Sequence, residues 1–128
     1  MLEFSHGYTY SAHPVACRGV AALDLLVKED ALGRVRELAP YFEAAVHGLK
    51  GVRHVADIRN CGWPRPHDRA CAGEPARRPY EIAMHCWKNG FYVRYGGDTI
   101  QLAPPFIAEK REIDSLIGAL NDALLATD

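Results

Sequence analysis

The segment FYVRYGGDTIQLAPP, residues 91–105, carries the clearest structural signal in the sequence. Two runs rich in aromatic and β-branched residues, 91–95 and 99–102, flank the tripeptide Gly96-Gly97-Asp98. Glycine and aspartate tolerate the positive φ angles that tight hairpin turns require. The segment therefore predicts a β-hairpin. Pro104-Pro105 predicts the end of its second strand, because proline cannot donate to a sheet ladder.

Two helices are predicted within the first 50 residues, because apolar residues recur there three or four positions apart. The first begins at His13-Pro14, after a loop, and ends near residue 30. The second spans residues 32–49. Pro40 should kink or break this second helix, because proline lacks the N–H that a helix interior needs, and Gly51 is the expected stop.

The rest of the chain mixes a strand, a loop and two more helices. Residues 52–58 predict a strand, whereas residues 62–79 contain four prolines and predict an irregular loop. Helices are expected over residues 80–88, ended by Asn89-Gly90, and over residues 113–124. The fold class is therefore α/β, an α+β-like small domain with helices on one face of a small sheet.

The composition favours one globular domain and excludes several classes. The chain has 128 residues, of which 48% are hydrophobic, and a formal net charge of -1. This balance provides a core and gives no basic surface for nucleic acid. No apolar run approaches the roughly 18 residues that span a bilayer, and no basic flank with an apolar stretch predicts a signal peptide. We expect a cytoplasmic protein.

The cysteines are predicted to be reduced thiols. There are four of them, and none forms a C-x-x-C pair. The spacing of nearby cysteines and histidines matches no common zinc pattern, so no metal site is expected among Cys61, His67, Cys71, His85 and Cys86.

Residues 4–17, FSHGYTYSAHPVAC, closely resemble a segment of class III aminotransferases, which depend on pyridoxal 5'-phosphate (PLP). The resemblance is to the ω-amino acid–pyruvate and β-alanine–pyruvate branch, in which this segment follows the catalytic lysine. Residues 37–43, 57–60 and 93–105 also resemble segments of these enzymes, and they occur in the same order along the chain. The resemblance covers nearly the whole chain.

This resemblance implies a fold and an assembly. The family has the type I fold, with a large PLP-binding domain and a smaller domain that carries the C-terminus, and it works as a homodimer or a dimer of dimers. Residues 1–13 would be the cofactor-phosphate loop and residues 14–128 the small domain. A small domain without its large domain should expose apolar surface, so we expect poor solubility or oligomers.

Two residues acquire roles from the resemblance. Thr9 matches the threonine that binds the PLP phosphate across the dimer interface, where a hydroxyl can donate to a phosphate oxygen. Arg94 matches the arginine that holds the substrate carboxylate, for which the planar guanidinium fork is suited. Without the motifs, Thr9 would be a loop hydroxyl with local bonds and Arg94 a surface arginine on a hairpin.

The lysine that holds PLP covalently precedes the HGYT motif in the family, and here five residues precede His6. The four lysines present fall at helical or helix-end positions and are expected on the surface: Lys28, Lys50, Lys88 and Lys110. No catalytic residue is therefore assigned. We expect a truncated or remnant aminotransferase, inactive alone, whose parent moves an amino group from an ω-amino acid or amine to pyruvate. Its partner would be another copy or a missing large domain.

Two further hypotheses stay open. The chain would alternatively be a non-catalytic interaction or dimerisation module derived from that domain. Residues 63–72, WPRPHDRACA, stand where the family has an apolar strand, which suggests a short out-of-frame reading over residues 62–72. Loss of that strand should leave its neighbours partly unpaired.

Overall fold

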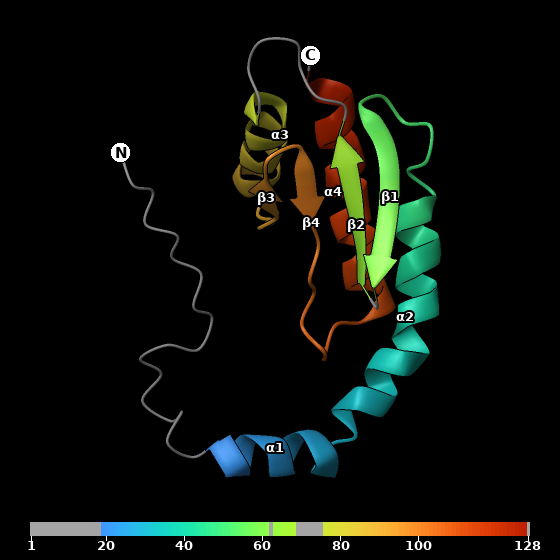
Figure 1. Cartoon of the computed structure of the whole chain (residues 1–128), viewed down its shortest axis with the longest axis vertical. Coiled ribbons are helices and arrows are strands. Elements are labelled where there is room, and N and C mark those ends of the chain that lie inside the picture. Colours follow the sequence, from blue (N-terminus) through green and yellow to red (C-terminus); the bar gives the residue numbers. More distant parts are fainter. Residues whose placement is uncertain (1–18, 62, 69–75, 128) are drawn as a thin grey trace.

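The fold is seen in a computed structural model, which describes residues 19–61, 63–68 and 76–127. Within these residues there are four helices and four short strands (Figure 1). In chain order they are α1 (Gly19–Lys28), α2 (Ala31–His47), β1 (Val55–Cys61), β2 (Trp63–Asp68), α3 (Arg77–Lys88), β3 (Arg94–Gly96), β4 (Thr99–Gln101) and α4 (Lys110–Ala126).

The strands form one antiparallel sheet in the order β1-β2-β4-β3. Figure 1 shows α4 behind this sheet, with α2 along one side and α3 along the other. α2 packs on β1 and β2, α3 packs on β3 and β4, and both helices pack on α4. α1 packs against α2 and extends away from the sheet. The predicted class, helices packed on a small sheet, is confirmed.

A single hydrophobic core lies between the helices and the sheet. On α2 the buried residues Leu38, Phe42 and Val46 are four apart, so they share one face of the helix. The predicted stripe on the last helix behaves in the same way, because Ile113, Leu120 and Leu124 are all buried. The largest fully buried side chains come from all three packed helices and include Phe42, Ile82, Ile113 and Leu120.

A polar contact joins α2 to α4 at the surface. The hydroxyl of Tyr41 donates a hydrogen bond to Asp114 Oδ1 at 2.6 Å. This hydrogen bond, with a smaller contribution from burial, raises the pKa of Tyr41 above its usual value. The ammonium group of Lys110 lies 5.0 Å from the centre of the Tyr41 ring, within the range of a cation–π contact.

Pro40 lies inside α2, and the helix continues through it, so of the two predicted outcomes, a kink or a break, the break is wrong. The helix curves along its length (Figure 1). A proline in a helix interior costs roughly 3 kcal/mol, but burial of Leu38, Phe42 and Val46 on both sides of it provides a larger stabilisation. The helix ends at His47 with Gly48 as its cap, earlier than the predicted stop at Gly51.

The largest correction concerns residues 62–79, predicted as an irregular loop. Within the described part of that range, β2 forms over Trp63–Asp68 and α3 begins at Arg77. β1 is also shifted from the predicted residues 52–58 to Val55–Cys61. β2 pairs with β1 and, at His67 and Thr99, with β4. The expectation that the neighbouring strands would be left partly unpaired is therefore wrong for β1, which is paired along its length. The proposed out-of-frame reading stays a hypothesis.

The start of α2 depends on Asp30, which has a left-handed φ of 46° and accepts a hydrogen bond from the Gly33 N–H at 3.2 Å. Replacing Asp30 by Ala is expected to lower the free energy of unfolding by about 1–2 kcal/mol, because the cap is lost and the positive φ remains. Urea unfolding of both chains measures this. Asp24→Ala on α1 is the control, and an equal loss there would contradict the capping role.

Candidate functional site

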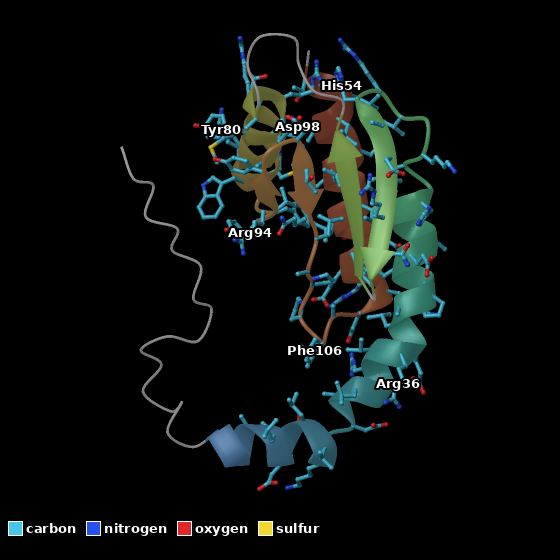
Figure 2. The ribbon with its side chains drawn as sticks, viewed as in Figure 1. Arg36, His54, Tyr80, Arg94, Asp98 and Phe106 are labelled. Carbon is cyan, nitrogen blue, oxygen red and sulfur yellow. The ribbon has the colours of Figure 1, made fainter. Side chains whose placement is uncertain are left out.

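The predicted hairpin is present, although its first strand is shorter than expected. Arg94 pairs with Gln101, Tyr95 with Ile100 and Gly96 with Thr99. Gly97 turns the chain with a φ of 54°, a conformation that glycine adopts without steric cost. The hairpin therefore places Arg94 on β3, at the end of the sheet beside α3 (Figures 1 and 2).

The turn of the hairpin is tied to the start of α3. Asp98 Oδ1 accepts a hydrogen bond from the backbone N–H of Ala76 at 3.4 Å. Ala76 precedes α3 and has a left-handed φ of 66°. One side chain thus links the turn after Arg94 to the helix that packs beside it.

Arg94 is exposed and has no hydrogen bond or ion pair with any described residue. Other arginines are engaged: those at positions 59, 77 and 111 form ion pairs, and Arg34 donates to the Ile107 carbonyl at 3.0 Å. Arg36, on α2, resembles Arg94 in being exposed without such a partner (Figure 2). A guanidinium without an internal carboxylate is available for the carboxylate of a ligand.

Arg94 lines a surface hollow of about 330 Å³ between α3 and β3. Of the described residues that line it, only Arg94 is charged; the others are Ala83, Met84, Trp87, Tyr92, Val93 and Tyr95. The hollow thus combines one cation with an aromatic and aliphatic wall. That combination suits a small molecule with one carboxylate and an apolar body.

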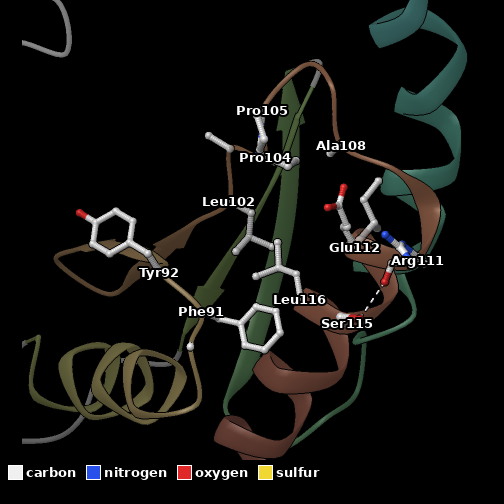
Figure 3. Close-up of a pocket in the computed structure, with 13 residues that line it drawn as sticks. Phe91, Tyr92, Leu102, Pro104, Pro105, Ala108, Arg111, Glu112, Ser115 and Leu116 are labelled. Carbon is white, nitrogen blue, oxygen red and sulfur yellow. Dashed lines mark hydrogen bonds between the residues drawn. The ribbon is translucent and has the colours of Figure 1, made fainter.

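A larger hollow of about 730 Å³ lies between α4 and the segment after β4 (Figure 3). Two of its polar side chains make hydrogen bonds within the first turns of α4. Glu112 accepts from the Glu109 N–H at 2.8 Å, and the Ser115 hydroxyl donates to the Arg111 carbonyl at 2.8 Å. The rest of the lining is largely apolar, including Phe91, Leu102, Pro104 and Leu116. These contacts leave no obvious group for catalysis there.

The sequence profile of the class-III aminotransferases matches residues 1–124, nearly the whole chain. The chain belongs to this family. It is 51% identical to the β-alanine–pyruvate aminotransferase of Pseudomonas aeruginosa, over 96% of this chain and 28% of that protein. It is 50% identical to the ω-amino acid–pyruvate aminotransferase of Pseudomonas putida, with the same coverage. The chain thus spans little more than a quarter of these relatives.

Solved aminotransferases share the fold. A PMP-bound aminotransferase from Vibrio fluvialis superposes with a TM-score of 0.78 at 29% identity, over 95% of this chain and 29% of that one. An adenosylmethionine-8-amino-7-oxononanoate aminotransferase from Methanocaldococcus jannaschii gives a TM-score of 0.79 at 26% identity, over 98% of this chain and 31% of that one. The predicted fold class, part of a fold type I PLP-dependent transferase, is therefore confirmed.

The lysines of this class III aminotransferase are all exposed, as predicted. Lys28 and Lys88 end α1 and α3, Lys110 begins α4, and Lys50 lies in the turn after α2. None lines the hollow beside Arg94. The described residues therefore provide no buried lysine amine. Thr9, the predicted phosphate ligand, lies outside the described residues.

Two features of the described residues bear on other functions. No group of three or more potential metal ligands occurs among them. In the same residues, no helix has the length and apolar character needed to cross a bilayer. Of the residues weighed for zinc, His85 contacts the Asn89 amide at 3.4 Å, and the Cys86 side chain is buried in the core.

Cys86 is expected to be unreactive in the folded chain. Burial raises the pKa of its thiol to about 11, from an ordinary 9.0. At pH 8 the thiolate fraction should then be about 100-fold lower than in the unfolded chain, and alkylation at Cys86 should slow by a similar factor. Peptide mass spectrometry after iodoacetamide treatment, with and without urea, measures this. Equal rates would contradict it.

The buried neutral thiol of Cys86 also makes the free energy of unfolding depend on pH. Its stabilising contribution is complete below pH 9 and is lost as the pH rises toward 11.

Proposed function

We propose that this chain provides the small domain and the substrate-carboxylate site of an ω-amino acid–pyruvate aminotransferase. The observation that carries the proposal is Arg94, an exposed guanidinium that has no hydrogen bond or ion pair with the described residues and is the one charged residue among those of them that line an otherwise apolar and aromatic hollow. Both substrates of such an enzyme, the ω-amino acid and pyruvate, carry a carboxylate. One arginine can therefore bind either of them in turn.

In this proposal each residue of the chain has a binding or positioning role. Arg94 binds the carboxylate through two parallel hydrogen bonds and so orients the amino or keto end toward the cofactor. PLP, when bound, supplies the chemistry that carries the amino group between donor and acceptor. Thr9, within the proposed phosphate loop of residues 1–13, donates to the cofactor phosphate, and residues 14–128 form the small domain. A homo-oligomeric assembly and a cytoplasmic location belong to the same proposal.

The lysine that holds PLP is proposed to lie outside these 128 residues, because each lysine present is exposed and none lines the hollow beside Arg94. The purified chain, given PLP, β-alanine and pyruvate, should therefore form no alanine. It should also show no visible absorbance band that borohydride fixes onto a lysine. Turnover by the chain alone, or such a band, would overturn this part of the proposal.

A hybrid enzyme tests the rest. In it, this chain replaces the matching 28% of the Pseudomonas aeruginosa β-alanine–pyruvate aminotransferase, a relative of 51% identity. We expect the hybrid enzyme to bind PLP and to transfer the amino group of β-alanine to pyruvate. A folded hybrid that binds PLP but does not turn over would contradict the proposed role of the chain.

The alternative, a non-catalytic interaction module, is favoured by one observation. Three large apolar residues of α1 are exposed, with 63% exposure for Leu23, 51% for Leu25 and 79% for Val27. If this surface joins two copies, sedimentation should show a dimer of the isolated chain. Val27→Glu should then return it to a monomer while the helical circular dichroism stays unchanged. A monomeric parent chain would remove this alternative.

A further inference from the structure

The strand that carries Arg94 has little support from the sheet itself. β3 has three residues and stands at the end of the strand order, so β4 is its only strand neighbour among the described residues. Arg94 has no partner of its own in that part of the chain. Contacts of the adjoining residues must therefore set the direction of its side chain.

Two aromatic contacts from α3 engage those adjoining residues. The Tyr80 ring meets the Tyr95 ring edge to face, with centroids 5.8 Å apart and an interplanar angle of 72°. The Trp87 ring meets the Tyr92 ring in the same way, at 6.0 Å and 80°. These are the distances and angles that aromatic pairs prefer. In the sequence, Arg94 lies between Tyr92 and Tyr95, the two tyrosines that contact α3.

The spacing explains why one helix can make both contacts. Tyr80 and Trp87 are seven residues apart, which is about two helical turns, so they lie on one face of α3. Tyr80 contacts Tyr95, and Trp87 contacts Tyr92. The four rings are 40% to 76% exposed, so they are not core residues packed there for burial alone.

We propose that Tyr80 and Trp87 are positioning residues, which brace the β3 segment against α3 and so hold Arg94 ready for the substrate carboxylate. The hydrogen bond from the Ala76 N–H to Asp98 is a third tie between the same two elements. This inference rests on the carboxylate-binding role proposed for Arg94. A binding group held in place loses less conformational freedom when its ligand arrives, so the brace increases affinity for carboxylates.

Trp87→Ala tests the brace in the hybrid enzyme. We expect the KM for β-alanine and the inhibition constant of propionate, which is β-alanine without its amino group, each to rise about tenfold. The kcat at saturating β-alanine should change less than about twofold, and Trp87→Phe should restore most of the affinity, since an aromatic ring is retained. Tyr80→Ala should act in the same direction. Phe106→Ala, a truncation of a surface ring in the segment after β4, is the control and should change neither constant.

The outcomes separate this inference from the proposed function. If Arg94→Ala leaves the propionate constant unchanged, the carboxylate role itself is wrong. If Arg94→Ala raises that constant and Trp87→Ala does not, the brace is wrong and the function stands. An equal rise after Phe106→Ala would mean that the effect is not specific to the brace, and would overturn the inference.

A measurement on the 128-residue chain needs no catalysis. The Nε–Hε groups of Arg94 and Arg36 can be followed by ¹⁵N relaxation, and Arg36 serves as a matched exposed arginine without a partner. Trp87→Ala should increase the mobility of the Arg94 group and leave that of Arg36 unchanged, whereas Trp87→Phe should leave both near their original values. No change at Arg94, or an equal change at Arg36, would overturn the proposed brace.

Discussion

The Phe42→Ala variant is expected to lose about 3–5 kcal/mol of the free energy of unfolding, the usual cost of truncating a fully buried phenylalanine. Phe42 has 0% exposure and lies at the middle of the α2 stripe, in the core that α2 shares with α4 and the sheet. The variant removes most of the ring's apolar area and leaves a cavity that the neighbouring side chains fill only in part. Small domains have total stabilities of about 5–15 kcal/mol, so the variant should be close to unfolding.

Urea unfolding of the chain, followed by circular dichroism, measures the loss. Phe106→Ala is the matched control, because Phe106 is 40% exposed on the segment after β4 (Figure 2). It should change the free energy of unfolding by less than about 1 kcal/mol. Similar losses from the two variants would mean that the core described between α2 and α4 is not what stabilises the chain.

The helices could be predicted because their signal is local. Leu38, Phe42 and Val46 repeat at a spacing that only a helix places on one face, and the same holds for the stripe on α4. The stop of α2 was misplaced by three residues, because both Gly48 and Gly51 can end a helix and tertiary packing decides which of them does. Pro40 does not break α2. The sequence shows the free-energy cost of a proline inside a helix, but it does not show how deeply the residues on both sides of it are buried.

β2 could not be predicted because its pairing is non-local. Pro64 and Pro66 argue against an inner strand, since each lacks an N–H for the ladder. They are two residues apart, so both missing N–H groups face the same side of the strand. This arrangement of the prolines fits the pairing of β2, which has an extended ladder with β1 but only one paired position with β4. A sequence pattern shows the prolines but not which neighbour they face.

The site was only partly visible in the sequence. The hairpin motif located Arg94, but its availability depends on where the nearby acidic groups are directed. Asp98 is four residues from Arg94, yet its carboxylate accepts from the Ala76 N–H and makes no pair with the arginine. The aromatic contacts from α3 left a sequence signal, the spacing of seven between Tyr80 and Trp87, which has meaning only once α3 is placed beside β3.

Arg94→Ala in the hybrid enzyme is expected to lower kcat/KM for β-alanine by about 30- to 1000-fold, the equivalent of 2–4 kcal/mol for a lost charge-assisted pair. The variant leaves the substrate carboxylate in the hollow without a cation. Arg94→Lys should recover part of this loss, because an ammonium keeps the charge but not the planar fork. In the donor half-reaction alone, without pyruvate, ethylamine, which is β-alanine without its carboxylate, should react with the PLP forms of the two enzymes at rates that agree within about threefold, because ethylamine has no carboxylate for the guanidinium to bind.

The comparison between donors decides what Arg94 does. An arginine needed only for folding of the β3–β4 hairpin would, on removal, slow β-alanine and ethylamine alike. Removal of an arginine that binds carboxylates would slow the reaction of β-alanine alone. Arg36→Ala, which removes an exposed arginine that also has no hydrogen bond or ion pair among the described residues, would slow neither reaction. Since Arg94 is exposed and has no hydrogen bond within the described residues, its removal breaks no internal contact there, so a selective loss can be assigned to the ligand.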